Sequence, residues 1–293
     1  MTPADKPRTA AGYSPDAVTA VREACLWLAT VLGDLMGDSL VIAGGLVPGL
    51  LVDQENLPEG ADRHPGTLGL DVALQLGVLE AEQYREISKR LREAGCAVGT
   101  NKEGNRTLQR WKIAGVDGKE VLLEFLIAPS EEGEPPGTVK HIEDDFGAFV
   151  TRGLELAFKD RERCHLRGKT ILGEEATRDI AVCGPGAFVV LKALAFRNRG
   201  SRKDAFDLYY VIRNYGRGAA DVAARLKPLL DDPAANDAIG TLRTDFSSPD
   251  AVGVTRAAEF VAGRRDDGLR QDIFGDVSEL LTACNGPASK IRQ

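Results

Sequence analysis

The sequence predicts an α+β protein: a mixed β-sheet lobe with flanking helices, followed by a helical C-terminal lobe. Apolar runs typical of strands alternate with helical spacing as far as about residue 182, and after Pro185 the spacing is helical throughout. The chain has 293 residues, 43% of them hydrophobic, so it can bury a sizeable core. We expect a disordered tail at 1–13, an α/β lobe at 14–182 and a helical lobe at 183–293.

Composition and charge exclude several classes of protein. A net charge of −7 means that the whole molecule does not attract nucleic acid, so any such contact needs a local patch. Apolar runs such as 187–196 are too short to span a bilayer, and residues 1–12 lack the apolar segment of a signal peptide. Five scattered cysteines and three histidines argue against a disulfide framework or a zinc site. We therefore expect a cytoplasmic protein without membrane association.

Breakers and apolar spacing divide the first half of the chain into short elements. Ser14-Pro15-Asp16 is a typical helix start, and Gly44-Gly45 ends an apolar run. Asp117-Gly118 is a hairpin turn between two alternating segments. The expected elements are a helix at 14–36, a strand at 39–43, a helical turn at 46–52, a loop at 54–66, a strand at 68–74, a helix at 80–93, a hairpin of 108–113 with 120–127, and an acidic loop at 130–138.

The second half begins with strands and ends with helices. Two strand regions are expected at 157–171 and 177–182. The helices that we expect after Pro185 are 188–198, 203–215, 219–230, 250–262 and 271–283.

The Gly44-Gly45 turn is the first candidate for binding. Two glycines between a strand and a helix let the backbone approach a phosphate closely, and a helix N-terminus favours an anion. By itself such a turn is more often a plain tight turn, so its meaning depends on the residues that follow.

Two acids interrupt apolar strands. Asp71 lies within 68–74 and Glu124 within 120–127. A carboxylate is unfavourable beside a core unless it is paired or binds a cation, although an edge strand facing solvent would also explain Asp71. If the two strands are neighbours, Asp71 and Glu124 are a pair of ligands for Mg²⁺.

Cations gather at the start of the helical lobe. Lys192 interrupts a buried-looking helix, and Arg199 follows two turns later on the same face. Lys203 and Asp207 are four residues apart on the next helix. These cations would neutralise a triphosphate, while spacing alone favours a solvated face with ordinary ion pairs.

Further polar residues have plainer interpretations. Arg161, Arg163, Arg167 and Lys169 suit the solvated face of a β-ribbon, with an acceptor groove as the alternative. His64 is interpreted as a structural loop histidine.

The chain resembles the nucleotidyltransferase fold through an ordered set of motifs: Gly44-Gly45, His64-x-Gly66-Thr67-x-x-x-Asp71, Glu124, Lys192 and Arg202-Lys203-Asp204-x-x-Asp207-Leu208-Tyr209. It is more closely similar to the AbiEii-type abortive-infection toxins, the toxin half of bacterial type IV toxin–antitoxin pairs. The resemblance covers roughly 39–215, and its last motif is the more family-specific one.

The resemblance implies a Mg²⁺-dependent enzyme that transfers a nucleoside monophosphate from an NTP to an acceptor hydroxyl, in some members the 3′ end of tRNA. It implies RNA as the acceptor and a cognate antitoxin as a partner. Asp71 and Glu124 would be metal ligands, and Asp207 would orient Lys192 or act as an acid or base. The nucleotide-binding residues that it implies are Gly44, Gly45, Thr67, Lys192, Arg199 and Lys203.

Two positions depart from the family pattern. Glu124 replaces the usual Asp with an equivalent carboxylate, whereas Gly69 stands where the family has the first Asp of Asp-x-Asp. Losing a metal-binding carboxylate lowers the rate on the order of a thousand-fold. Natural divergence, deliberate inactivation and a pseudoenzyme are all consistent with Gly69.

Two other functions stay open. A catalytically inactive nucleotide-binding or partner-binding protein would explain Gly69. A nucleotidyltransferase acting on a small cationic aminoglycoside would suit the acidic loop and the net charge of −7.

Overall fold

The computed structural model describes residues 7–36, 39–57, 60–75, 81–101, 103–130, 134–144 and 146–285. The chain folds into two compact units, which we describe separately. The sheet unit comprises 13–50 and 65–183, and the helical unit comprises 1–12, 51–64 and 184–293. The expected boundary near 183 lies where the chain enters its last helical segment. Residues 51–64, which include most of the expected loop 54–66, belong to the helical unit and not to the first lobe.

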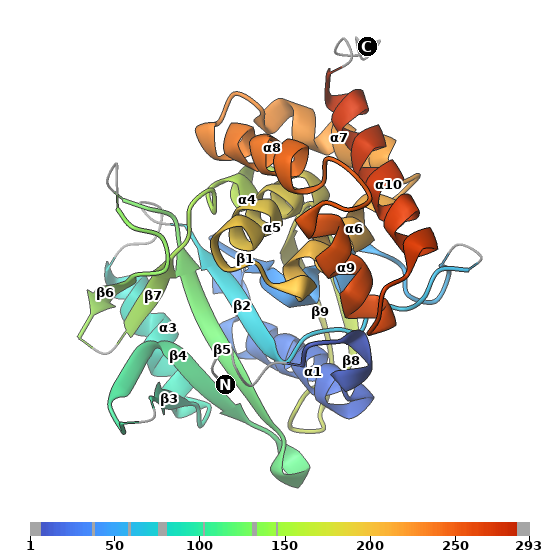
Figure 1. Cartoon of the computed structure of the whole chain (residues 1–293). Helices are drawn as coiled ribbons and strands as arrows, with labels where there is room; N and C mark the ends of the chain where they lie inside the picture. Colours follow the sequence, from blue (N-terminus) through green and yellow to red (C-terminus); the bar gives the residue numbers. More distant parts are fainter. Residues whose placement is uncertain are drawn as a thin grey trace, which may run out of the picture. The chain divides into compact units, whose positions relative to one another are not determined.

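The sheet unit is built on one mixed sheet (Figure 1). Along its main path the strand order is β3-β4-β5-β2-β1-β9-β8, and β7 joins β5 and β6 beside that path. Its strands are β1 (Leu40–Ala43), β2 (Gly69–Leu74), β3 (Ala97–Thr100), β4 (Arg106–Ala114), β5 (Glu120–Ile127), β6 (Val139–Glu143), β7 (Phe146–Val150), β8 (Arg161–Lys169) and β9 (Glu175–Cys183). The predicted fold class, α+β with a mixed sheet, is confirmed.

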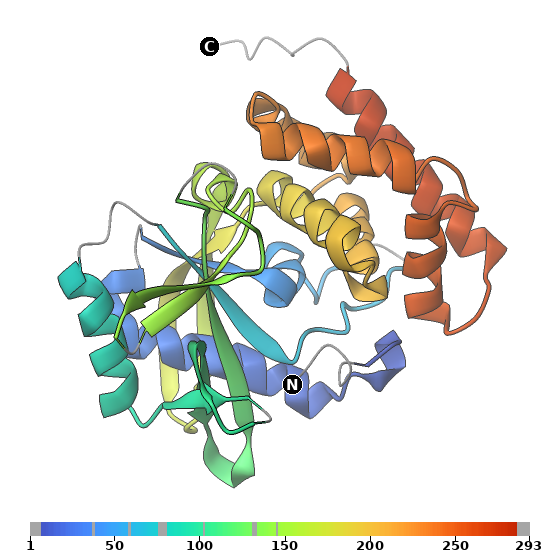
Figure 2. The same ribbon diagram turned by 60° about the vertical axis from the view of Figure 1, so that its left-hand side comes forward.

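Helices cover one face of this sheet. Helix α1 (Pro15–Leu32) starts after Ser14 with proline in its first turn and ends at Gly33, whose φ is 53°. Helix α3 (Ala81–Glu93) buries the expected face, Tyr84, Ile87 and Leu91. Figure 2 shows α1, in blue, and α3, in teal, beside the strands. The smaller helical segments of this unit are η3 (Gly33–Met36), η4 (Gly44–Leu46), α2 (Val47–Leu51), η5 (Val116–Gly118) and α4 (Leu156–Lys159).

Strand register separates a buried face from an open one. Along β5, residues 121, 123, 125 and 127 are buried, while 122, 124 and 126 are half-buried. Because β2 pairs with β5 and β5 with β4, Asp71, Glu124 and Arg110 fall in one row on the open face. The alternation of buried and half-buried residues along β4 and β5 therefore places Arg110 and Glu124 on the open face.

The helical unit contains six long helices within the described part of the chain (Figure 2, gold to red). Helix α5 begins with Pro185 and ends at Gly200, which adopts the left-handed conformation that terminates many helices. These helices are α5 (Pro185–Arg199), α6 (Arg202–Asn214), α7 (Ala219–Leu226), α8 (Pro233–Asp245), α9 (Val252–Ala262) and α10 (Asp267–Asn285). Two 3-10 turns, η2 (Ala10–Gly12) and η6 (Lys227–Leu229), complete the unit.

Several elements differ from the prediction. Strands β3, β6 and β7 were not expected because each is short and flanked by glycines or charges that weaken the alternating pattern. Residues 157–159 form part of α4 instead of a strand. Helix α8 was also not expected, although Asp232 accepts a hydrogen bond from the Ala234 amide at its start, as an N-cap does. Residues 1–6 of the expected tail and Glu131 and Glu132 of the acidic loop lie outside the described residues.

Candidate functional site

The two predicted acids are direct neighbours in the sheet unit. Strands β2 and β5 run parallel, and their register places Asp71 opposite Glu124. Both side chains are half-buried on the open face of the sheet. Neighbouring strands lie about 4.8 Å apart, so the two carboxylates are close enough for one small cation to reach both.

The glycine turn lies against Asp71. Strand β1 pairs with β2 so that Ala43 is opposite Asp71, and Gly44 follows with a φ of 68°. A Cβ atom on Gly44 would overlap the Asp71 carboxylate, so this position requires glycine for both conformation and space. Helix α2, behind the turn, has five residues, too few to supply the helix dipole that the sequence suggested.

Thr67 and Gly69 lie at the entry to β2. The Thr67 hydroxyl donates to the Gly69 carbonyl at 3.4 Å. Gly69 pairs with Leu122, and its φ is outside the left-handed region that favours glycine. A Cβ atom built there would meet the Leu122 carbonyl oxygen at 3.4 Å as its nearest neighbour, an ordinary van der Waals distance. The backbone at Gly69 can therefore accept an aspartate.

Asp71 and Glu124 fit a single Mg²⁺ ion. This ion binds proteins through one or two carboxylates together with substrate phosphates and water. Among the described residues, three or more His, Cys, Asp or Glu side chains do not gather into any group that could hold a metal. The pair therefore suits one ion with few protein ligands.

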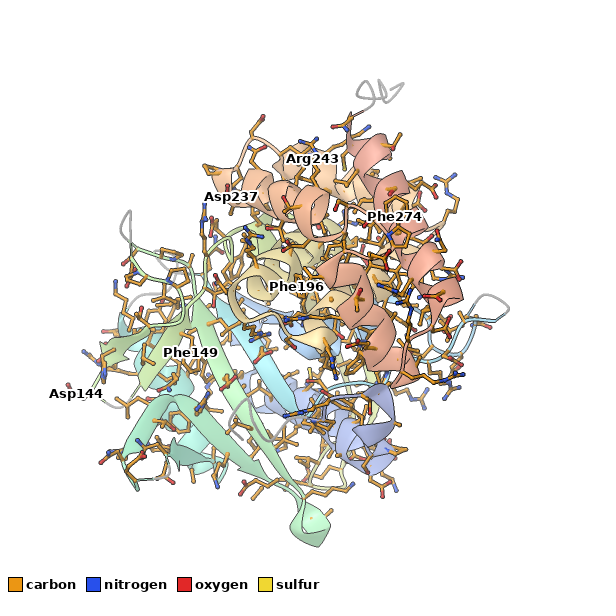
Figure 3. All side chains as sticks on the ribbon, viewed as in Figure 1. Asp144, Phe149, Phe196, Asp237, Arg243 and Phe274 are labelled. Atoms are coloured by element: carbon orange, nitrogen blue, oxygen red, sulfur yellow. The ribbon has the colours of Figure 1, made fainter. Side chains whose placement is uncertain are left out.

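Arg110 is the residue of this site that the sequence analysis missed. It lies opposite Glu124 in the β4–β5 hairpin, and its Nε donates to Glu124 Oε1 at 2.5 Å. Its guanidinium lies over the ring of Phe149, 5.2 Å from the centroid; Figure 3 labels Phe149 on β7. The alternation of 108–113 with 120–127 was a usable signal, because a hairpin register fixes which charges are opposite each other.

The cations expected in the helical lobe form a second, buried cluster inside the helical unit. Lys192 of α5 donates to Asp204 at 3.0 Å and to Asp207 at 2.8 Å, and its side chain is 9% exposed. Burial by itself would lower the pKa of Lys192, but Asp207 and Asp204 together outweigh it and raise the pKa above its ordinary value. Lys192 is therefore a charged residue whose ammonium group is already engaged.

Asp207 is the centre of that cluster. Its carboxylate also accepts hydrogen bonds from Lys203 at 2.7 Å and from His64 Nε2 at 2.9 Å. Burial alone would raise the pKa of Asp207, yet Lys192 and Lys203 lower it well below the ordinary value. A carboxylate held ionised in this way suits an orienting role better than that of an acid or base.

Arg199 closes the cluster on its exposed side. Its Nε and Nη2 bond both oxygens of Asp204, at 2.6 and 2.8 Å, while the side chain is 60% exposed. Burial would raise the pKa of Asp204, but Lys192 and then Arg199 lower it to about 2. With three cations, two carboxylates and a neutral histidine, the cluster has a formal charge of +1.

The basic residues 161–169 lie at alternate positions of β8. Arg163, Arg167 and Lys169 are exposed, and His165 pairs with Asp179 across to β9 at 2.8 Å. These features agree with the β-ribbon face expected from the sequence.

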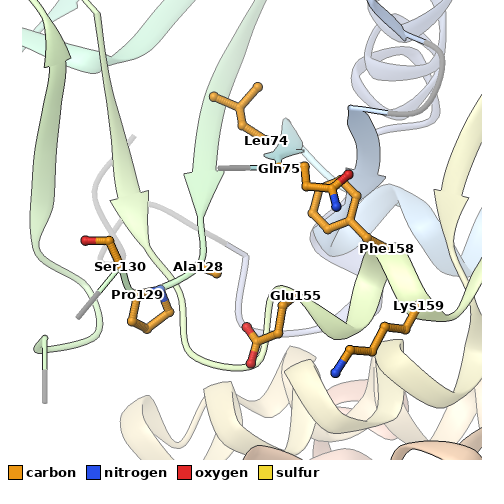
Figure 4. Close-up of a pocket in the computed structure, with 8 residues that line it drawn as sticks. All are labelled: Leu74, Gln75, Ala128, Pro129, Ser130, Glu155, Phe158 and Lys159. Atoms are coloured by element: carbon orange, nitrogen blue, oxygen red, sulfur yellow. The ribbon is translucent and has the colours of Figure 1, made fainter. Parts of the chain in front are cut away.

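A separate pocket opens at the other end of β2 and β5. It has a volume of about 560 Å³ and lies between Leu74, Ala128 and the α4 region, which contributes Glu155 and Lys159 (Figure 4). Leu74 is three residues beyond Asp71, a distance of about 10 Å along a strand. Within the described residues, Glu155 Oε2 is buried without a hydrogen-bond partner. No pattern in the sequence indicated this pocket.

No protein-family model matches the sequence, and no curated protein matches it significantly. Among solved structures, the chain is similar to an antigenic nucleotidyltransferase-like protein from Paracoccidioides brasiliensis, with a TM-score of 0.43 and 15% identity over 78% of this chain and 88% of that one. This likeness is too low to transfer the neighbour's properties. In the described part of the chain, no helix has the length and apolar character needed to cross a bilayer.

Proposed function

We propose that this chain is a nucleotidyltransferase of the AbiEii toxin type whose activity is impaired at Gly69. The observation that supports the proposal is the register that places Asp71 beside Glu124, with the Gly44 turn directly against Asp71. A pair of carboxylates next to a glycine turn suits transfer from a nucleoside triphosphate.

Asp71 and Glu124 would hold one Mg²⁺. When bound, that ion would neutralise negative charge on the triphosphate oxygens during transfer. The missing carboxylate at Gly69 leaves the site with one charged ligand fewer than the family pattern, which is the proposed cause of impairment.

The proposed reaction joins an acceptor hydroxyl oxygen to the α-phosphorus and releases pyrophosphate. The hydroxyl proton passes to solvent water as the new P–O bond forms, and the bond from the α-phosphorus to the bridging oxygen breaks, so that this oxygen leaves with pyrophosphate. In this proposal Asp71 and Glu124, beside the Gly44 turn, would hold the cation that positions the reacting phosphate. RNA, with the tRNA 3′ end as the proposed site, and a cognate antitoxin are expectations that rest on the family resemblance.

A second function is favoured by a specific observation. Because Glu124 is held by Arg110 and Gly69 lacks a carboxylate, the site is also suited to bind a nucleotide without turning it over. A non-catalytic nucleotide-binding protein is therefore the alternative that the test has to exclude.

The test compares the chain with its Gly69→Asp variant. Each protein is incubated with Mg²⁺, bacterial RNA and NTPs labelled at the α-phosphate, and label in RNA is measured over time. We expect Gly69→Asp to raise the transfer rate on the order of a thousand-fold, because it restores an anionic ligand. Gly69→Asn is the matched control, since it has the same size without the charge.

Three results would count against the proposal or refine it. Equal label with Gly69→Asp and Gly69→Asn would mean that charge at this position is unimportant. Activity of Gly69→Asp that survives Asp71→Asn would place the chemistry elsewhere. No label in RNA with any variant would reject RNA as the acceptor, and a parallel assay with an aminoglycoside would then test the small-molecule alternative.

A further inference from the structure

One cation lies beside the two carboxylates on the open face of the sheet. Arg110 is the third member of the row that begins with Asp71 and continues with Glu124. Its side chain is 31% exposed, and that of Glu124 is 21% exposed, so both can be reached by a ligand from solvent.

The ion pair changes the charge of the site. Three carboxylates in the family pattern would give a formal charge of −3, which repels a triphosphate unless metal ions are present. Here the row contains two carboxylates, Asp71 and Glu124, and one guanidinium, Arg110, so its formal charge is −1. Arg110 therefore supplies one of the two positive charges that a divalent ion would bring to this row.

The guanidinium also has the geometry to bind phosphate. Arginine has five N–H donors in a planar fork, and the bond to Glu124 uses the one on Nε. Within the described part of the chain, Glu124 is its one hydrogen-bond partner, which leaves the terminal nitrogens for a further acceptor. The Phe149 ring supports the plane of the group from one side and limits its motion.

We propose that Arg110 is a triphosphate-binding residue that takes the place of a divalent cation, so that this chain binds nucleoside triphosphates without metal. The proposal rests on the function proposed above, because it assumes that the Asp71–Glu124 site takes a nucleotide. It goes beyond that function by separating binding, which Arg110 supports, from transfer, which requires Mg²⁺.

The chain provides a matched control for this proposal. Lys112 lies two residues further along β4 on the same open face, and it pairs with Glu120 at 3.1 Å. Arg110→Met and Lys112→Met therefore remove the same charge from the same strand and the same face. Arg110→Lys keeps the charge but removes the planar fork.

The experiment measures binding of ATP, GTP, CTP and UTP to the full chain by calorimetry, once in EDTA and once in Mg²⁺. We expect the wild-type chain to bind at least one NTP in EDTA within about threefold of its affinity in Mg²⁺. Arg110→Met should weaken binding in EDTA about tenfold or more, as the loss of a charge-assisted hydrogen bond does. Lys112→Met should stay within about threefold of wild type, and Arg110→Lys should be intermediate.

A second measurement does not depend on nucleotide. Mn²⁺ binding to the nucleotide-free protein, followed by electron paramagnetic resonance, should be tighter in Arg110→Met than in wild type, because Glu124 is released from its ion pair. Lys112→Met should not change it. This result also shows that Arg110→Met keeps the folded site.

The outcomes separate the two proposals. Binding in EDTA that is unaffected by Arg110→Met, or binding that requires Mg²⁺, would overturn the role of Arg110 while leaving a nucleotide site in place. Failure of the wild-type chain to bind any NTP under either condition would overturn the proposed function itself.

Discussion

At the scale of single residues, Asp207 of the helical unit is a buried carboxylate with several hydrogen-bond partners. This carboxylate is fully buried and accepts hydrogen bonds from Lys192, Lys203 and His64. Removing one partner from a buried ion pair leaves an uncompensated charge and destabilises a protein by about 3–5 kcal/mol. The cluster therefore stabilises the packing of α6 against α5.

His64 predicts a pH dependence of stability with a definite sign. Burial, followed by the charge of Lys203, lowers the pKa of His64 to about 4 in the folded protein from an ordinary value of 6.5. Between pH 4 and pH 6.5, the unfolded chain therefore binds a proton at His64 that the folded chain does not bind. Stability from this group is complete above pH 6.5 and falls by about 3 kcal/mol as the pH drops towards 4.

Urea unfolding of wild type and His64→Gln between pH 7 and pH 4.5 measures this effect. The difference in unfolding free energy between the two proteins should shrink as the pH falls, because only wild type loses the contribution of His64. His165→Gln, which removes an exposed imidazole from the sheet unit, should not produce that convergence. Parallel curves for wild type and His64→Gln would show that His64 does not control the pH response.

At the scale of elements, glycines decide how closely two helices of the helical unit can pack. A Cβ atom on Gly186, in the first turn of α5, would meet the Arg225 carbonyl carbon and oxygen at 2.6 Å. Those atoms belong to the backbone of α7 and cannot rotate away. Gly240 of α8, by contrast, has no atom within 4 Å of the corresponding position.

These two glycines give opposite predictions for the same substitution. Gly186→Ala should destabilise the protein by about 1–3 kcal/mol, because α5 and α7 must move apart. Gly240→Ala should stabilise it by about 0.5–1 kcal/mol, because alanine reduces the entropy lost when a helix forms. Thermal unfolding followed by circular dichroism measures both, and a stabilising Gly186→Ala would contradict the close approach of the two helices.

At the scale of the whole molecule, the chain passes between its two units four times, after residues 12, 50, 64 and 183. The segment 51–64 is joined to the helical unit through Gln54, whose Oε1 accepts from the His64 amide at 2.9 Å and from the Tyr210 hydroxyl at 3.2 Å. This residue links the segment to α6, 156 positions further along the chain.

Gln54→Ala tests whether the segment depends on the helical unit. Losing this acceptor should raise amide hydrogen exchange in 51–64 and in α6 about tenfold, while β2 and β5 keep their protection. Glu55→Ala, an exposed neighbouring change, should have no effect. Faster exchange in β2 and β5 instead would show that the segment stabilises the sheet unit.

The sequence by itself determined the elements whose signal is local. The Asp117-Gly118 turn and the alternation around it predicted the β4–β5 hairpin, and regular apolar spacing predicted α1, α3, α5 and α6. It also indicated Asp71 and Glu124 as candidate site residues, because a carboxylate within an apolar strand departs from the local pattern. The short strands β3, β6 and β7 were missed because they are stabilised by their neighbours more than by their own residues.

Only the tertiary structure decided which of these elements meet. No local pattern states that β2 lies beside β5 in parallel, yet that pairing puts Asp71 next to Glu124. The hairpin register then places Arg110 opposite Glu124. His64 and Asp207 form a hydrogen bond although they are 143 positions apart in the sequence. The reason is physical: local dihedral preferences and apolar period are properties of a few consecutive residues, whereas the pairing of distant strands and buried charges depends on how the whole core excludes water.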